Sequence, residues 1–195
     1  MIIKTVSVKG GVGKSIISAY LAKYLAESGK RVLVVDKDYL KFSSLLIKNS
    51  VKGVDVVTDD TTLDYGNIER NYDFIIVDTP TMQFESKFDK ADEVVNLIVS
   101  DAFTLDLTVK YYKNLEGRKI LIVNMVYPFP SDIYNISERI KDLDFDIKIV
   151  IPFIPKLFSS LVKEGKIKVN IDLLRTLARE ILDKNFNKKL ITPIM

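Results

Sequence analysis

The 195-residue chain contains neither cysteine nor histidine. Without cysteine it can form no disulfide and no thiolate metal or redox site, and without histidine it has no imidazole to serve as a general base or a metal ligand. Enzymatic activity would therefore depend on carboxylates, hydroxyls, lysines and a magnesium ion. No apolar run reaches the ~18 residues that a membrane helix needs, and the N-terminus lacks the basic-then-apolar order of a signal peptide. We expect a cytoplasmic protein.

The composition is that of a globular α/β protein, with 47% apolar residues, 28% charged residues and a mean hydropathy of +0.11. A chain of this length is expected to form one domain, residues 1–195, and to bury roughly 70% of its unfolded surface. The net charge of +3 is unevenly distributed. Residues 1–150 contain 20 Lys and Arg against 22 Asp and Glu, whereas residues 151–195 contain 9 against 4. The basic excess is therefore concentrated in the last quarter of the chain.

The strongest signal is a glycine-rich turn between an apolar run and an apolar-periodic segment. Residues 1–8 are expected to form a buried strand, and the segment from Ile16 to about Gly29 a helix. Glycines in such a turn accept positive φ and let the backbone approach a polyphosphate closely. The amides and the dipole at the helix N-terminus favour anions. The turn reads Lys9-Gly10-Gly11-Val12-Gly13-Lys14-Ser15.

Two side chains of this turn suit a nucleotide. Lys14 can place a positive charge on the terminal phosphates, and the Ser15 hydroxyl can coordinate magnesium. The ordinary phosphate-loop pattern fails by one residue, because Val8 stands where its first glycine would be. The alternative interpretation is a glycine turn with two solvated lysines. The strand before the turn and the helix after it favour the nucleotide-binding interpretation.

Further strands are expected to end in polar residues at the edge of the sheet where such folds bind ligands. The buried run 31–36 ends in Asp36, with Asp38 two residues later, and the run 71–78 ends in Asp78. An acid in the position of Asp78 holds magnesium in phosphate-loop ATPases, usually through a water. Asp36 and Asp38 could instead be solvated turn residues, and Asn124, at the end of the strand 119–124, could be a turn former.

The turn from Lys9 to Ser15 resembles that of the ParA/MinD family of deviant-Walker ATPases, which reads lysine-glycine-glycine-x-glycine-lysine-serine/threonine. The resemblance implies that Lys9 reaches the nucleotide of a second subunit, so that ATP is sandwiched in a homodimer. It also implies that the nucleotide contacts Gly10, Gly11, Val12, Gly13, Lys14, Ser15 and Ile16. The family usually has a second threonine at the position of Ile16, which has no hydroxyl to offer a phosphate.

The segments Asp36-Lys37-Asp38 and Asp78-Thr79-Pro80 resemble the two switch regions of the same family. The resemblance implies that Asp38 positions the attacking water, that Asp36 lies near the magnesium shell and that Asp78 is the Walker B acid. It implies that Asn124 reads the adenine, and that Pro152 and Phe153 pack on the edge of the base. A proline that only ends a strand is the alternative for Pro152. The family often has proline and glutamine where this chain has Tyr39-Leu40.

Alternating strand and helix patterns predict a doubly wound, predominantly parallel twisted sheet flanked by helices, which is the P-loop NTPase fold. The remaining elements follow from the apolar spacing. Strands are expected at 54–57, 94–99 and, as the last strand, 146–152, helices at 42–47, 105–115, 133–143 and 171–182, a loop at 59–65, a turn at 128–132 and a tail at 186–195.

The residues favour MgATP hydrolysis by in-line attack of water, and the lack of an evident strong base predicts slow turnover. The resemblance is closest to small ParA-type partition ATPases. It implies ATP-driven dimerisation, non-specific DNA binding, association with the nucleoid and a separate ParB-like DNA-binding partner that stimulates hydrolysis. Basic residues near the C-terminus would neutralise DNA phosphates, although they could equally form a solvated helix face. They are Lys163, Lys166, Lys168, Arg175, Arg179 and Lys184.

The alternative function is that of a MinD-like, membrane-associated positioning ATPase. Such a protein would bind the membrane through a C-terminal amphipathic segment. The segment Leu190–Met195 is short and is interrupted by Pro193, so we expect no stable membrane anchor. Relatives of the nitrogenase-reductase and arsenite-pump kinds need cysteines, which this chain lacks. A metabolic phosphoryl transferase or ligase would need a substrate pocket that the sequence does not identify.

Overall fold

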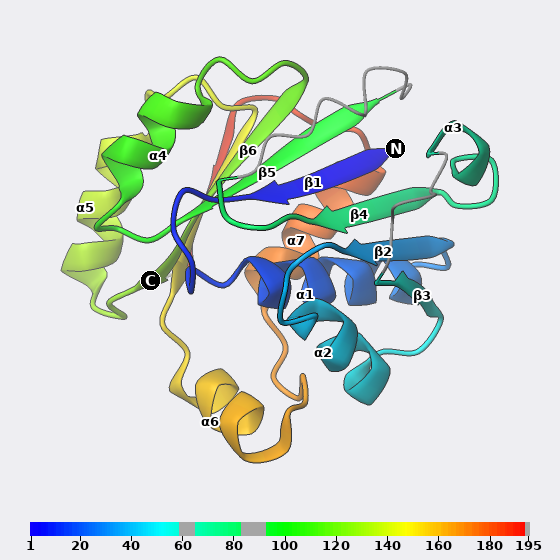
Figure 1. The fold of residues 1–195 in the computed structure, drawn as a ribbon. Helices are drawn as coiled ribbons and strands as arrows, with labels where there is room; N and C mark the ends of the chain where they lie inside the picture. Colours follow the sequence, from blue (N-terminus) through cyan, green and yellow to red (C-terminus); the bar gives the residue numbers. More distant parts are fainter. Residues whose placement is uncertain (59–64, 83–92, 194–195) are drawn as a thin grey trace.

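The computed structural model describes residues 1–58, 65–82 and 93–193. Its centre is an eight-stranded sheet of order β3-β2-β4-β1-β5-β6-β7-β8, in which every pair of neighbouring strands is parallel (Figure 1). The strands are β1 (Ile2–Val6), β2 (Val32–Asp36), β3 (Val54–Val57), β4 (Phe74–Asp78), β5 (Val94–Ser100), β6 (Arg118–Val126), β7 (Ile147–Pro152) and β8 (Lys189–Ile191).

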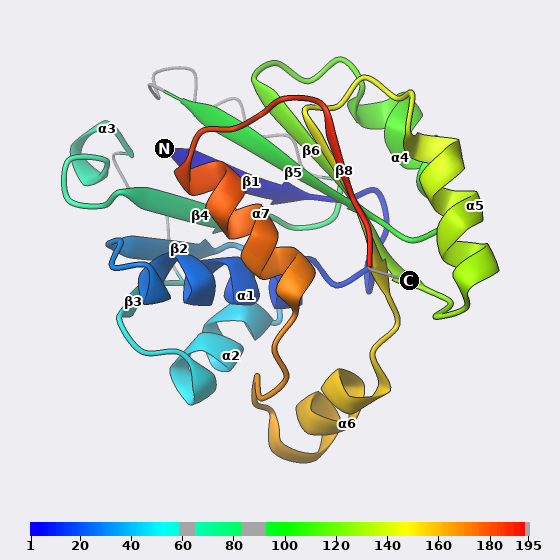
Figure 2. The same cartoon turned by 180° about the vertical axis from the view of Figure 1, so that it is seen from behind.

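Helices cover both faces of this sheet (Figures 1 and 2). Helices α1, α2 and α7 lie on one face, α4 and α5 lie on the other, and α6 follows the carboxyl end of β7. The helices are α1 (Lys14–Glu27), α2 (Phe42–Ser50), α3 (Tyr65–Ile68), α4 (Leu105–Tyr112), α5 (Pro130–Ile140), α6 (Pro155–Glu164) and α7 (Asp172–Leu182). The doubly wound parallel fold expected from the sequence is confirmed.

The central strands are continuous apolar runs because helices cover them on both sides. All five residues of β2 and all five of β4 are buried. In β1, Ile3 packs in the cluster that includes α1 and α7, whereas Ile2 packs with Leu33 and Val35 on the opposite face. Burial on both faces fixes where each strand ends, and therefore where the polar residues at its tip are held.

The C-terminal region and one helix start differ from the expectation. The segment 146–152 is not the last strand, because Lys189–Ile191 forms β8, with Ile191 paired to Ile149 of β7. Three residues are too few to show a strand period, but the open edge of β7 offers them backbone partners. Helix α5 begins at Pro130, inside the expected turn, since proline suits the first helical turn. Of the expected loop 59–65, residues 59–64 lie outside the described residues and Tyr65 begins α3.

Because the strands are parallel, their carboxyl ends meet at one edge of the sheet. We call it the carboxyl edge; it carries the loops that follow β1, β2, β4, β5, β6 and β7. Ligands of open α/β sheets bind at this edge. Within the described ranges no helix is both long and apolar enough to cross a membrane.

Candidate nucleotide-binding site

The glycine-rich turn joins the carboxyl end of β1 to the N-terminus of α1 (Figure 1). Gly11 has φ 79° and Gly13 has φ 96° and ψ 18°, the left-handed conformation that glycine adopts without strain. The carbonyl of Gly13 accepts the amide of Ile17 at 3.0 Å, which starts the helix. Among the described residues no side chain caps the N-terminus of α1. Its first amides are therefore available to an anion bound in the turn.

Lys14 and Ser15 open α1 and are both buried, Lys14 being 6% exposed. The Lys14 ammonium donates a hydrogen bond of 3.3 Å to the Thr81 hydroxyl, just after β4. An ammonium can donate three hydrogen bonds, and within the described part of the chain no other hydrogen bond of this group is found. Lys14 is therefore held at the carboxyl edge with donor capacity to spare for phosphate oxygens.

Asp36 and Asp78 end the neighbouring strands β2 and β4 and are paired in register, and both are fully buried. Oδ1 of Asp78 accepts a hydrogen bond of 3.5 Å from Ser18 of α1. Burial raises the pKa of Asp78 to about 6; the Ser15 hydroxyl opposes this rise, whereas the negative charge of Asp36 adds to it. Asp78 is thus a carboxylate whose charge is poorly solvated.

The residues fit a magnesium ion bound with a nucleotide. Oδ2 of Asp78 is buried without a hydrogen-bond partner among the described residues, and the Ser15 side chain is close enough to influence the pKa of Asp78. The described residues contain no group of three acidic side chains that could hold a metal alone. Magnesium is commonly held by one or two protein oxygens together with water and substrate phosphates. Ser15 and Asp78 would supply those protein oxygens.

The switch segment after β2 places its two aspartates differently. The carboxylate oxygens of Asp36 accept hydrogen bonds from the backbone amides of Asp38, at 3.1 Å, and Ser44, at 2.9 Å. Asp36 therefore organises the turn that presents Asp38, a role that the sequence alone did not indicate. Asp38 lines a cleft of about 340 Å³ at the carboxyl edge. We call it the phosphate cleft; it is lined by Gly10, Gly11, Gly13, Lys14, Ser15, Ile16, Asp38, Leu40, Phe42 and Thr81.

A second cleft, of about 170 Å³ and largely apolar, lies on the other side of the same turn. We call it the apolar cleft. It shares Gly11, Gly13 and Ile16 with the phosphate cleft, and it is also lined by Asn124, Met125, Pro152, Phe153 and residues of α6. The Asn124 amide donates a hydrogen bond of 2.9 Å to the carbonyl of Val12, which connects β6 to the turn. All three residues expected near the base therefore lie together, next to the phosphate cleft.

Lys9 stands exposed at the start of the turn, with 49% of its side chain accessible. Its ammonium lies 2.6 Å from Oδ2 of Asp101, which follows β5, and 5.9 Å from the centre of the exposed Phe103 ring. The other oxygen of Asp101 accepts the amide and the hydroxyl of Thr104, both at 2.7 Å. No sequence motif includes Asp101 or Thr81, although both follow buried strands, Asp101 directly after β5 and Thr81 three residues after β4.

The structure separates the basic C-terminal residues into paired and unpaired groups. Lys168 pairs with Glu164, Arg175 with Glu27 and Lys184 with Glu93. Within the described ranges no ion pair is found for Lys163, Lys166 or Arg179.

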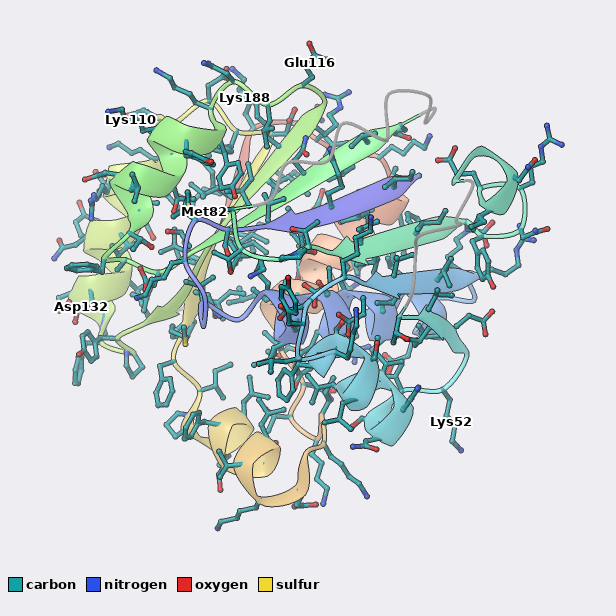
Figure 3. All side chains as sticks on the ribbon, viewed as in Figure 1. Lys52, Met82, Lys110, Glu116, Asp132 and Lys188 are labelled. Atoms are coloured by element: carbon teal, nitrogen blue, oxygen red, sulfur yellow. The ribbon has the colours of Figure 1, made fainter. Side chains whose placement is uncertain are left out.

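The loop after α6 lies against the C-terminal end of α2. Ser50 accepts the amide of Ile167 at 2.8 Å, and Asn49 donates to the carbonyl of Gly165 at 3.4 Å. Four exposed lysines flank this contact in the sequence, and one of them, Lys52, projects outward from the molecule (Figure 3). We call these residues, Lys48, Lys52, Lys163 and Lys166, the lysine cluster.

Comparisons with known proteins agree with this geometry. The family model described as the CobQ/CobB/MinD/ParA nucleotide binding domain matches residues 3–193. A chain of the MinC:MinD cell division protein complex of Aquifex aeolicus is similar in structure, with a TM-score of 0.65 and 19% identity over 93% of this chain and 96% of that chain. A plasmid partition protein of Borrelia burgdorferi bound to AMPPNP has a TM-score of 0.64 and 19% identity over 93% of this chain and 96% of that chain.

The septum site-determining protein MinD of Pyrococcus horikoshii, complexed with Mg-ADP, has a TM-score of 0.56 and 20% identity over 92% of this chain and 95% of that chain. No curated protein matches the sequence significantly. At these identities the solved structures establish the fold, and they include both cell-division and plasmid-partition proteins.

Proposed function

The chain belongs to the CobQ/CobB/MinD/ParA family of nucleotide-binding domains, and we propose that it is a DNA partition ATPase. In this proposal MgATP drives the formation of a sandwich homodimer that binds DNA without sequence preference, and hydrolysis returns the protein to its starting state. A separate ParB-like DNA-binding protein would stimulate hydrolysis. The observation that carries the proposal is the pair of adjoining clefts on the two sides of one glycine-rich turn.

The two clefts match the two ends of ATP. The phosphate cleft contains the Lys14 ammonium and the unpaired first amides of α1, which suit a polyphosphate. The apolar cleft contains the flat faces and edges of Pro152 and Phe153 together with the Asn124 amide, which suit a purine. Ile16 lines both clefts and contributes apolar surface to each.

Each polar residue then has a defined task in phosphoryl transfer to water. Lys14 and the amides of the turn bind the phosphates and stabilise the charge of the transferring group. Ser15 and Asp78 hold magnesium, which neutralises phosphate charge when it is bound. Asp38, which lines the phosphate cleft, orients the attacking water. The described residues of this cleft include no histidine or second carboxylate beside Asp38, which fits slow turnover.

Dimerisation through the carboxyl edge is supported by its exposed apolar side chains. Exposed large apolar residues are unusual when they gather on one surface, and they mark interaction sites. Here they lie at or after the carboxyl ends of four strands or belong to α6, and Lys9 stands among them. They are Tyr39, Leu40, Phe103, Met125, Tyr127, Phe129, Phe153, Phe158 and Val162. A second copy seated on this edge would cover these side chains and receive Lys9 at its nucleotide.

DNA binding is assigned to the lysine cluster. Its four lysines are exposed and have no ion pair within the described ranges, whereas three of the six residues expected from the sequence are paired with carboxylates. An unpaired ammonium can neutralise a phosphate without first breaking an internal ion pair. The cluster thus adds Lys48 and Lys52 to the DNA-binding residues expected from the sequence.

The first experiment measures dimerisation and DNA binding together. Light scattering after gel filtration should show a doubling of mass with ATP and magnesium, and no doubling for Lys9→Ala or Lys14→Ala. DNA co-sedimentation should require ATP, and the slope of log affinity against log salt should become less negative by roughly 3 to 4 when all four cluster lysines are changed to alanine. Lys110→Ala, in α4, combined with Lys113→Ala, directly after it, is the control on the opposite face of the sheet.

The alternative, membrane association like that of MinD, is tested in the same experiment with anionic liposomes in place of DNA. Leu190 and Ile191 of the segment that would contact a membrane pair with β7 instead, which favours DNA. ATP-dependent sedimentation with liposomes and not with DNA would reverse that preference. A mass that does not change with nucleotide would refute the sandwich homodimer under either alternative.

A further inference from the structure

The turn after β4 is fastened to β1 and to the glycine-rich turn. The amide and the hydroxyl of Thr79 both donate hydrogen bonds to the carbonyl of Thr5, at 3.3 Å and 2.7 Å. The amide of Met82 donates 3.0 Å to the carbonyl of Ser7. Two bonds at one end and one at the other fix the four-residue segment 79–82 beside the phosphate cleft. Met82 lies at that junction, as labelled in Figure 3.

Thr81 occupies the middle of this fixed segment, and its side chain faces the phosphate cleft. A Cβ placed on Gly10 would lie 3.8 Å from Oγ1 of Thr81, so the hydroxyl stands over the backbone of the glycine-rich turn. The same Oγ1 accepts the hydrogen bond of 3.3 Å from Lys14. The Lys14 ammonium is therefore held by a hydroxyl from the segment that follows β4.

A hydroxyl that accepts from an ammonium can still donate its own proton. Among the described residues no acceptor for the Thr81 proton is found. A phosphate oxygen held by Lys14 would lie within reach of both donors. Thr81 is attached to the switch segment that follows the metal-side acid Asp78, whereas Lys14 is attached to α1. A terminal phosphate that contacts both would connect these two elements.

We propose that Thr81 is a positioning residue for the terminal phosphate of ATP, through which the site distinguishes a nucleoside triphosphate from a diphosphate. The hydroxyl holds Lys14 before the nucleotide binds and donates to the γ-phosphate afterwards. When ADP is bound, the Thr81 hydroxyl stays hydrogen-bonded to Lys14 and makes no hydrogen bond to the nucleotide. This inference rests on the proposed nucleotide site and adds a residue that the sequence motifs do not include.

Calorimetric titration with magnesium and either AMPPNP or ADP tests the inference. Thr81→Val removes the hydroxyl at nearly constant volume, and we expect AMPPNP affinity to fall about tenfold, the effect of one hydrogen bond to a charged group. ADP affinity should stay within about twofold, and Thr81→Ser should restore AMPPNP binding. Thr58→Val, an exposed threonine after β3, is the matched control and should change neither affinity.

The outcomes separate this inference from the function on which it rests. Unchanged AMPPNP affinity in Thr81→Val, or an equal loss of AMPPNP and ADP affinity that serine does not restore, would overturn the role of Thr81 while leaving the nucleotide site intact. Failure of the wild-type protein to bind either nucleotide would overturn both the site and the inference.

Discussion

Replacing Asp78 by asparagine should stabilise the nucleotide-free protein at neutral pH. The carboxyl group is fully buried at the end of β4, and burial raises its pKa from the ordinary value of 3.8 to about 6. A raised pKa means that the folded protein binds the proton more tightly than the unfolded chain does. Its contribution to stability is therefore complete below pH ~4 and is lost as the pH rises to ~6.

The size of this effect follows from the shift. A difference of about two pKa units corresponds to about 3 kcal/mol of unfolding free energy lost between pH 4 and pH 7. Asparagine keeps the acceptor for Ser18 but leaves an amide where Oδ2 has no partner, which costs about 1 to 2 kcal/mol. The net gain at pH 7 should then be about 1 to 2 kcal/mol, while magnesium-dependent nucleotide binding is weakened.

Urea denaturation without nucleotide or magnesium, at pH 4.5 and at pH 7.5, measures both effects. Wild-type stability should fall relative to Asp78→Asn as the pH rises, whereas Asp183→Asn, a change at an exposed site after α7, should follow the wild type. If the difference between wild type and Asp78→Asn is the same at both pH values, Asp78 is not a strained charge and the reasoning about its burial is wrong.

Two further substitutions test the turn and the packing of α1. Gly13→Ala should destabilise the protein by about 1 to 2 kcal/mol or more, because φ is 96° and the added Cβ would lie 2.5 Å from the Asn124 amide. Gly11→Ala, with φ 79° and no atom within 4 Å of the added Cβ, should show the backbone cost alone. Equal melting temperatures of the two variants would contradict the Asn124 contact. Tyr20→Phe removes a partly buried hydrogen bond of 2.5 Å to the carbonyl of Val169 and should cost about 1 to 3 kcal/mol in urea denaturation. A loss below ~0.5 kcal/mol would show that the loop before α7 relaxes.

The sequence by itself determined the fold class and pointed to a nucleotide ligand. The turn from Lys9 to Ser15 stands between an apolar run and a helical period, and the run 74–78 ends in a carboxylate, so the parallel fold and the type of ligand followed from patterns within a few residues of each other. The residues expected near the base, Asn124 and Pro152, could be proposed because each stands at the end of a strand expected from the sequence.

Tertiary structure decided the contacts between distant segments. Three hydrogen bonds join residues that no local period relates: those from Asn124 to Val12, from Lys14 to Thr81, and from Ile167 in the loop after α6 to Ser50. Strand β8 depends on the open edge of β7 and hardly on its own three residues. The reason is physical: sequence periods report which face of an element is apolar, whereas side-chain partners depend on how the elements pack in three dimensions.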